Sequence, residues 1–340
     1  MPRRRQRTAA LPRLSSVSGT VALRLTVTVV GVVAVCPEAV AAGGHTVPGV
    51  LRVTDAPFNA DPTGKTDATA ALQAAVEHAR ANENVSTVLL PAGVYRVTQP
   101  INVTAFQEQD AVGIAGDPGD PTDGPGVSAL RATKSTLGFA HTRPVLWLPP
   151  NTEGYGPNQT QYVLHLWRTD LPDATDLHPN GNFDQVVQTV DVHISAGNPG
   201  AVGVRHRAAQ HSMLDNMTVV IDGGVGVGVQ SLPGSGGLTK SIEVVGGHIG
   251  FDLRNTQPTT PVVGLVATGQ SCAGVVYAGQ QTLVLVGSVI QLGPGGTTAV
   301  AVPGDDHMCP TVATPPLPAD PGVRPEPDRA VGQVVIVDST

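Results

Sequence analysis

The sequence is poor in aromatic side chains, in charge and in cysteine. Phe, Trp and Tyr make up 3% of the 340 residues, and Asp, Glu, Lys and Arg together make up 14%. Its three cysteines are Cys36, Cys272 and Cys309. A chain of this length can bury enough apolar surface to fold without disulfides. In an exported protein Cys272 and Cys309 could pair, or they could stay free. A bridge between them would fasten a late loop and would not hold the fold together.

No apolar run is long enough to cross a bilayer, for which about 20 residues are needed. The apolar run Leu25–Val35 follows an arginine-rich start, and the cleavage motif Ala39-Val40-Ala41 comes after it. This order is typical of a secretory signal peptide, here residues 1–42 with cleavage near Ala41-Ala42. A lipoprotein signal ending at Cys36 is the weaker alternative, because Val35 stands where a small residue is required. The sequence therefore predicts a secreted protein without a membrane span.

Basic residues are also scarce once the signal segment is removed. That segment carries six arginines and one glutamate, so 14 basic and 26 acidic residues remain, a net charge of −12. Nucleic acid and anionic lipid bind to clustered Lys and Arg, which this chain does not offer. Neither is expected as a partner.

Helical periodicity occurs once, which argues against doubly wound α/β folds. Leu72, Ala75, Val76 and Ala79 fall at i, i+3, i+4 and i+7, so a helix over about 66–81 would place them on one face. Thr66 or Asp67 is suited to cap its start. The rest of the chain consists of short β-branched runs ending at glycine, which indicates an all-β body.

These β-branched runs repeat about every 24 residues. Val192–Gly197, Val219–Gly224 and Ile242–Gly247 superpose without gaps, and a second series follows each of them, for example Ala201–Val204 and Ile249–Leu253. Such a period is typical of a solenoid, whose stacked coils pair their strands and share one core. We expect the coils over residues 43–310, with the helix covering the unpaired first coil. Residues 311–340 form a Pro-rich tail with a possible last strand near 332–339.

The segment around the helix resembles the opening signature of the pectate-lyase superfamily, of the rhamnogalacturonase/epimerase type. The resemblance rests on Phe58-Asn59-Ala60-Asp61, Gly64-Lys65-Thr66-Asp67 and Leu90-Pro91-Ala92-Gly93-Val94-Tyr95. Asp61-Pro62 and Ala68 depart from the usual pattern. The resemblance implies a right-handed, single-stranded parallel β-helix, the pectin-lyase-like solenoid, in which the N-terminal α-helix is a structural cap. It implies fold more strongly than function.

A second stretch is similar to the first β-helix of the family 55 glycoside hydrolases, which are secreted exo-1,3-β-glucanases. It comprises Gly197–Gly203, Ala208–Leu214 and Gly246–Gly250. The resemblance implies that Gln210 lies near the attacking water. In that family the general acid comes from a second β-helix, for which this chain has no room. Catalysis by the same residues therefore does not follow from the likeness.

The chain can supply a carboxyl pair of its own. The superposed coils place Asp222 and Glu243 on neighbouring rungs, two positions apart and both outward, hence about 8 Å apart. Inverting hydrolysis needs an acid and a base about 6.5 to 9.5 Å apart. His193 falls in the column of Glu243, one rung further. The candidate catalytic residues are Gln210, Asp222 and Glu243, and the candidate substrate-binding residues are His193, His206 and Arg207.

Alternatives remain at each of these positions. Outward polar residues on a solenoid are usually only solvated, and Arg207 with His206 could simply cap a turn. Trp147 could stack on a pyranose, although a lone Trp in an apolar strand more often lies in the core.

Other chemistries lack their motifs. No Walker loop, zinc spacing or G-x-S-x-G elbow occurs, and the polygalacturonase and pectate-lyase motifs are fragmentary. The acidic loop containing Asp117, Asp120 and Asp123 is typical of a solvated turn, so neither a metal nor a cofactor is expected. The sequence thus predicts a protein that acts on polysaccharide, as a hydrolase or a lyase. The alternative is a non-catalytic glycan-binding or scaffold β-helix.

Overall fold

The computed structural model describes residues 48–82, 84–106, 129–132, 143–169, 185–208, 212–234, 236–254, 261–278, 282–302 and 333–340. The chain separates into two units, Met1–Gly43 and Gly44–Thr340, and every described residue belongs to the second. The expected signal peptide, the acidic loop around Asp120 and the Pro-rich tail up to residue 327 lie outside the described residues.

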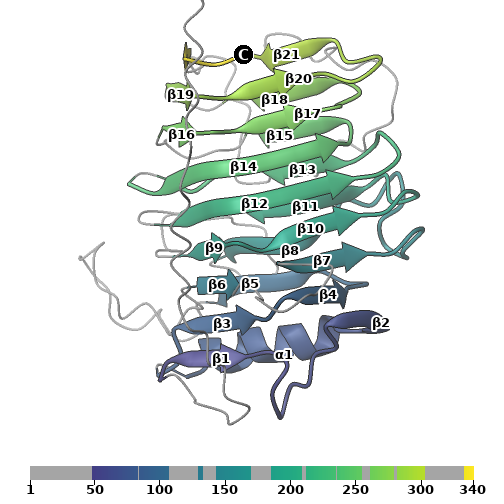
Figure 1. Ribbon diagram of the computed structural model, residues 1–340, viewed down its shortest axis with the longest axis vertical. Coiled ribbons are helices and arrows are strands. Elements are labelled where there is room, and N and C mark those ends of the chain that lie inside the picture. Colours follow the sequence, from purple (N-terminus) through teal and green to yellow (C-terminus); the bar gives the residue numbers. More distant parts are fainter. Residues whose placement is uncertain are drawn as a thin grey trace, which may run out of the picture. The chain divides into compact units, whose positions relative to one another are not determined.

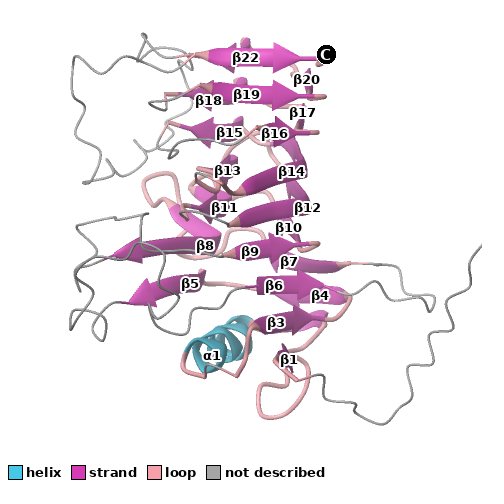
Figure 2. Cartoon of the chain, turned by 90° about the vertical axis from the view of Figure 1, so that its left-hand side faces the viewer, coloured by secondary structure: helices cyan, strands magenta, loops and turns pink. Residues whose placement is uncertain are grey.

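The described strands wind into coils with three faces (Figures 1 and 2). The first face contains β1 (Val50–Arg52), β3 (Thr87–Leu90), β6 (Ala129–Ala132), β9 (Val186–Gln188), the first parts of β12 (Met213–Ile221) and β14 (Leu238–Gly246), β16 (Val262–Val263), β19 (Leu283–Val286) and β22 (Val334–Val337).

The second face adjoins the first within one continuous sheet, because β12 and β14 run across both. It contains β2 (Thr63–Asp67), β4 (Gly93–Arg96), β7 (Pro144–Leu148), β10 (Asp191–Ile194), the second parts of β12 and β14, β17 (Val266–Thr268) and β20 (Val289–Gln291). The third face is a separate sheet of β5 (Ile101–Phe106), β8 (Gln161–Thr169), β11 (Ala201–His206), β13 (Val227–Gln230), β15 (Ile249–Leu253), β18 (Ala273–Tyr277) and β21 (Thr298–Ala301).

Neighbouring rungs pair in parallel throughout the described strands, for example β10 with β12 and β11 with β13. Successive strands of the third face begin at residues 201, 227, 249, 273 and 298, which is the repeat expected from the sequence. The parallel β-helix is therefore confirmed. Each rung lies about 4.8 Å from the next, so a side chain has its nearest same-face neighbours directly above and below it.

One sequence superposition is wrong by two residues. Val192 pairs with Val219 as expected, but Val219 pairs with Val244, whereas the glycine pairs had aligned it with Ile242. The reason is a difference in turn length. The turn after β12 spans residues 222–226, whereas the turn after β14 spans only 247–248, so the glycines of the two turns do not superpose.

A column of left-handed residues bends the chain between the first and second faces. Thr189, Asn216 and Ser241 have φ of 62°, 54° and 53°, and they occupy the same position in successive coils. Gly264, Gly287 and Asp338 continue the column with φ of 68°, 59° and 46°. One residue with positive φ therefore makes the corner in each of these coils, a conformation natural for Gly and Asn and costly for Thr.

The core lies inside the coils, and glycines on the third face let the opposite side chains fill it. A Cβ on Gly203 would lie 2.6 Å from Val219 Cγ1, and one on Gly228 would lie 2.4 Å from Val244 Cγ1. Gly203 and Gly228 are adjacent in the sheet. The valines of the second face thus reach the backbone of the third, and no side chain fits at these two positions.

The only described helix, α1 (Thr69–Arg80), lies at the start of the stack, beneath β3 and β5 (Figure 2). It buries Leu72, Ala75, Val76 and Ala79, as the periodicity predicted. The helix starts later than expected because β2 occupies Thr63–Asp67. The N-cap is Ala68, which makes no side-chain cap, and Asp67 instead accepts a hydrogen bond from the Thr69 N–H at 2.9 Å.

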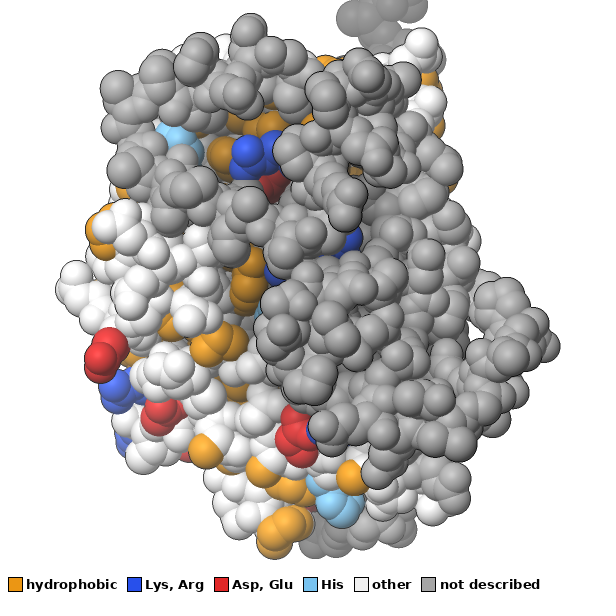
Figure 3. All heavy atoms as spheres, turned by 180° about the vertical axis from the view of Figure 1, so that it is seen from behind, with side chains coloured by type: hydrophobic (Ala, Val, Ile, Leu, Met, Phe, Trp, Pro, Cys, Tyr) orange, Lys and Arg blue, Asp and Glu red, His pale blue; other side chains and the backbone are white. Residues whose placement is uncertain are grey.

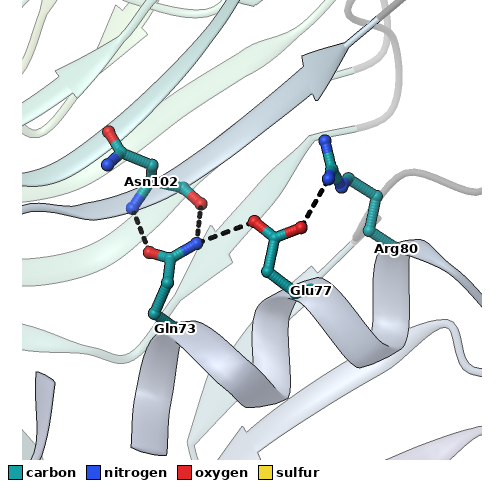
Figure 4. A network of polar contacts seen from close by, with 4 residues as sticks. All are labelled: Gln73, Glu77, Arg80 and Asn102. Carbon is teal, nitrogen blue, oxygen red and sulfur yellow. Dashed lines mark hydrogen bonds and ion pairs between the residues drawn. The ribbon is translucent and has the colours of Figure 1, made fainter. Parts of the chain in front are cut away.

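Helix α1 also covers the edge of the third face. The side-chain amide of Gln73 donates to the Asn102 carbonyl at 3.0 Å and accepts from the Asn102 N–H at 2.8 Å (Figure 4). Asn102 lies on β5, the first strand of that sheet. Gln73 therefore supplies the donor and the acceptor that a preceding strand would have supplied. Glu77 accepts from Gln73 Nε2 at 2.9 Å and pairs with Arg80, which holds the amide in place.

At the other end of the stack, β22 pairs with β19 in full register. Strand β22 lies within residues 332–339, the segment for which the sequence suggested a possible last strand. Val335, Ile336 and Val337 on β22 are 42%, 53% and 42% exposed. None of the described helices is long and apolar enough to cross a membrane.

Candidate functional site on the second face

On the outer side of the second face, polar and charged residues from successive rungs lie in one column. Thr218 pairs with Glu243, and Asp191 directly precedes Val192, which pairs with Val219. Asp191, Thr218 and Glu243 therefore follow one another on three successive rungs, and we call them the central column. Two rungs separate the two acids, so their backbones lie about 9 to 10 Å apart.

Asp191 is the most constrained member of the central column. Its carboxylate pairs with Arg143 Nη2 at 2.7 Å and accepts a hydrogen bond from the Thr218 N–H at 2.8 Å. Burial raises the pKa of Asp191 above its usual value and the Glu243 carboxylate adds to the rise, whereas the Thr218 N–H and Arg143 oppose it. Arg143 also donates two hydrogen bonds to Asn216. One is accepted by Asn216 Oδ1 at 3.2 Å and the other by the Asn216 main-chain carbonyl.

Asp222 does not join Glu243, contrary to the sequence expectation. Asp222 lies four positions beyond Thr218, the partner of Glu243, so about 13 Å of strand separates their backbones before the rung is added. Asp222 instead accepts a hydrogen bond from His193 Nε2 at 2.9 Å. His193 stands in register with Val220 and Val245, so it does not share a column with Glu243 either. The two-residue slip in the superposition is the cause of both differences.

His206 and Arg207 are buried, although the sequence suggested them as sugar ligands. His206 is fully buried and Arg207 is 7% exposed. Burial lowers the pKa of His206 to about 4, so the ring is neutral at neutral pH. The Arg207 N–H donates to the Leu166 carbonyl at 2.9 Å and extends the ladder beyond β11. Neither side chain is placed to meet a polysaccharide at the surface.

A second set of polar residues lies along the third face and is buried as well. His165, Arg205, Gln230 and Asp252 stand in register on β8, β11, β13 and β15. Burial, with Arg205 next to it, holds the pKa of His165 well below its usual value. Asp252 pairs with Arg254 at 2.8 Å. The side chains of His165, Arg205, Gln230 and Asp252 are therefore not available to a ligand at the surface.

Two residues singled out from the sequence, Gln210 and Cys309, lie outside the described residues. Cys272 is disulfide-bonded, and its pairing with Cys309 stays a prediction. Within the described ranges, no three His, Cys, Asp or Glu side chains gather as metal ligands would. Acidic and basic side chains are few and interspersed on the face drawn in Figure 3, as far as its residues are described.

Sequence reasoning missed Asp191 and Arg143, and it weighed Trp147 as a core residue more often than a sugar-stacking one. Asp191 and Arg143 escaped notice because the slipped superposition gave Glu243 other neighbours. Trp147 was expected in the core, but β7 alternates buried and partly exposed residues, and Trp147 falls on the partly exposed side. The alternation in Pro144-Val145-Leu146-Trp147-Leu148 was the available signal, because Leu146 and Leu148 must share the face opposite to Trp147.

Comparisons with solved structures return other proteins at low identity. Iota-carrageenase complexed with iota-carrageenan fragments is 10% identical over 79% of this chain and 46% of that one, with a TM-score of 0.32. The Streptococcus pneumoniae surface adhesin PfbA is 11% identical over 71% and 61%, with a TM-score of 0.32. The A-module of the Azotobacter vinelandii mannuronan C-5 epimerase AlgE4 is 17% identical over 85% and 76%, with a TM-score of 0.27. The chain spans about half the length of iota-carrageenase, and TM-scores this low support no inference about activity.

Curated protein sequences contain no match to this chain. The specific likeness to family 55 glycoside hydrolases is not confirmed by any of these comparisons. A sequence model described as "Rhamnogalacturonase A/epimerase, pectate lyase-like" matches residues 52–291, which takes in the stack from β1 to β20. The chain therefore belongs to the rhamnogalacturonase A/epimerase, pectate lyase-like family.

Proposed function

We propose that this protein is a secreted glycoside hydrolase that cleaves polysaccharide on its second face with inversion, using Asp191 and Glu243. The observation that carries the proposal is the central column, in which two outward carboxyl groups stand two rungs apart. Their backbone separation of about 9 to 10 Å comes close to the carboxyl separation of about 6.5 to 9.5 Å that leaves room for an attacking water.

The environments of the two acids suggest their roles. Burial and the nearby Glu243 raise the pKa of Asp191, which favours the protonated form that a general acid requires. Glu243 would then act as the general base that activates water. Thr218 lies between them, and its N–H orients Asp191 by donating to Oδ1 at 2.8 Å.

Turnover of purified protein tests this assignment. We expect release of reducing ends from a soluble polysaccharide, with the β-glucan laminarin and polygalacturonic acid as the two substrates of the first trial. Glu243→Gln and Asp191→Asn should each lower kcat by at least about a hundredfold. Asp55→Asn is the control, because Asp55 is an exposed acid in the turn after β1, outside the central column, and it should retain most activity.

The pH profile tests the roles separately. If Asp191 is the acid, kcat/KM falls as pH rises through its raised pKa, because the proton it must donate is then lost. Loss of this alkaline limb in Asp191→Asn, with the acidic limb kept, would support the assignment. Full activity of both Glu243→Gln and Asp191→Asn would refute it.

Secretion is the part of the proposal that rests on residues 1–42. Fusion of this segment to a reporter should export the reporter, and replacing Leu25–Val35 by a polar sequence should retain it in the cell. An unprocessed N-terminus on exported protein would contradict cleavage near Ala41-Ala42.

A non-catalytic glycan-binding protein is the second candidate, favoured by one contact. The Asp191 carboxylate already engages Arg143 at 2.7 Å and the Thr218 N–H, as a structural ion pair would. Binding of polysaccharide without any turnover, in wild-type protein and in Glu243→Gln alike, would establish this candidate in place of the hydrolase.

A further inference from the structure

Trp147 presents its indole to the outside of the second face. It lies on β7 between the buried residues Leu146 and Leu148, and its own side chain is partly exposed. Its Nε1–H donates to Ser195 Oγ at 2.9 Å, from the turn that follows β10. This hydrogen bond satisfies the polar edge of the indole and restricts its rotation, so the apolar ring surface is held in one orientation.

Polar residues stand on either side of Trp147 in the same column. Arg96 on β4 and His193 on β10 are each in register with Trp147, on the rungs before and after it. The His193 and Asp222 side chains are 38% and 49% exposed, and they hydrogen-bond each other at 2.9 Å. We call Arg96, Trp147 and His193 the Trp147 platform. It combines a flat apolar surface with a donor on one side and a donor–acceptor pair on the other.

We propose that the Trp147 platform is a binding subsite for one pyranose unit of a β-linked polysaccharide with equatorial hydroxyl groups. A pyranose with equatorial hydroxyls leaves a flat C–H surface above and below its ring, which packs on an indole and buries apolar area on both partners. The hydroxyls then point outward around the ring edge. The Asp222 carboxylate would accept hydrogen bonds from hydroxyl groups on one side of the sugar. The Arg96 guanidinium would donate to hydroxyl groups on the opposite side.

The position of the platform relates it to the proposed cleavage site. Trp147 is one rung and two residues from Asp191, because Val145 is in register with Asp191. The two backbones are therefore about 8 Å apart. The platform would hold the sugar adjoining the one that Asp191 protonates. This inference rests on the proposed function for its substrate class, but binding at the platform does not require that Asp191 or Glu243 be catalytic.

Equilibrium binding to the full chain tests the platform. We expect laminarin oligosaccharides to bind wild-type protein and to change tryptophan fluorescence, and axial-hydroxyl oligogalacturonides to bind at least about tenfold more weakly. Trp147→Ala should raise the Kd for laminarin oligosaccharides by about tenfold or more. Trp147→Phe, which keeps an aromatic surface, should keep most of the wild-type affinity. Thr268→Ala, in the same column three rungs beyond His193, is the matched control and should bind like wild type.

The outcomes separate the two proposals. Unchanged affinity in Trp147→Ala, with a wild-type circular dichroism spectrum, would overturn the platform and leave the hydrolase untouched. Trp147-dependent binding without turnover would support the platform and refute the hydrolase. Equal affinity for oligogalacturonides would overturn the equatorial-hydroxyl preference, and absence of any binding would overturn the platform.

Discussion

Gly228 shows how closely the second and third faces approach at the level of one residue. A Cβ there would lie 2.4 Å from Val244 Cγ1 and 2.6 Å from the Gly250 carbonyl oxygen. Val244 is buried in the core and Gly250 lies on the adjacent strand β15, so neither can move aside cheaply. We expect Gly228→Ala to lower the free energy of unfolding by about 1 to 3 kcal/mol, through overpacking.

Urea unfolding followed by circular dichroism would measure this loss. Gly156→Ala is the matched control, because a Cβ there meets only the end of a flexible side chain, Gln159 Oε1 at 3.1 Å. It should change the free energy of unfolding by no more than about 0.5 kcal/mol. Equal stability of Gly228→Ala and wild type would show that the backbone yields at this position.

Thr189 is the most strained member of the left-handed column. Its φ of 62° is costly for a β-branched side chain, whereas Asn216 occupies the same position of the next coil without a branch. Thr189→Asn should therefore raise the free energy of unfolding by about 1 kcal/mol. Thr218→Asn, in the extended part of β12, removes a β-branched residue where it is favoured and should not stabilise. A stabilisation of both variants, or of neither, in thermal unfolding would contradict this reasoning.

His206 makes stability depend on pH. Burial lowers its pKa to about 4 in the folded protein, below the value of about 6.5 in the unfolded chain. The unfolded chain therefore binds the proton first, and stability is lost as pH falls from about 6.5 to about 4, by about 3 kcal/mol in all. Below that range the loss levels off.

The measurement is the free energy of unfolding as a function of pH for His206→Gln and for the control His193→Gln. We expect the slope between pH 6.5 and 4 to be reduced in His206→Gln, with part remaining because burial also lowers the pKa of His165 and His248. His193→Gln controls for the loss of one histidine, since the His193 side chain is 38% exposed. A wild-type slope in His206→Gln would mean that other groups cause the acid sensitivity.

At the scale of elements, helix α1 acts as an edge cover through one side chain. Gln73 makes two hydrogen bonds to the Asn102 main chain, and Leu at this position can make neither. Gln73→Leu should lower the free energy of unfolding by about 1 to 3 kcal/mol, because the Asn102 N–H and carbonyl lose their partners. The exposed edge of β5 should also favour association.

Chemical unfolding and size-exclusion chromatography would follow both effects. Glu77→Gln is the control, because it keeps an acceptor for Gln73 and loses only the partly exposed pair with Arg80, worth about 0.5 kcal/mol. A monomeric Gln73→Leu of unchanged stability would show that the packing of Leu72 and Val76 alone covers the edge.

The elements could be predicted from the sequence to different degrees. The helix followed from the spacing of Leu72, Ala75, Val76 and Ala79, because only one face of an exposed helix is apolar. The register between β12 and β14 could not, because it depends on the lengths of turns that carry similar glycines. The composition of the central column depends on that register, which is why Asp191 and Arg143 were found only in the structure.

At the scale of the whole molecule, the stack differs between its two ends. Helix α1 covers one end, whereas β22 at the other carries Val335, Ile336 and Val337 at 42% to 53% exposure. Among the described strands β22 pairs with β19 alone, and an apolar edge strand of this kind is a template for pairing with another chain. We expect Ile336→Lys to reduce aggregation during heating while changing the free energy of unfolding by no more than about 0.5 kcal/mol.

Light scattering during a thermal ramp would test this. Val263→Lys is the control, since Val263 on β16 is 44% exposed but its strand is paired on both sides. Equal suppression by the two lysines would assign the effect to net charge. The repeat itself was predictable at this scale, because a period near 24 residues with glycine-bounded strands has few other solutions.

The corner between the second and third faces tolerates unequal lengths. Five residues fill it after β12 and two after β14, yet the strands on both sides stay in step. The left-handed column, in contrast, admits one residue per coil. Insertions and deletions can therefore accumulate at the first kind of corner without shifting the register, whereas at the second kind a single extra residue would turn every later side chain of that strand to the opposite face. New surface loops can therefore be added at the corner between the second and third faces, by natural selection or by engineering, but not at the corner formed by the left-handed column.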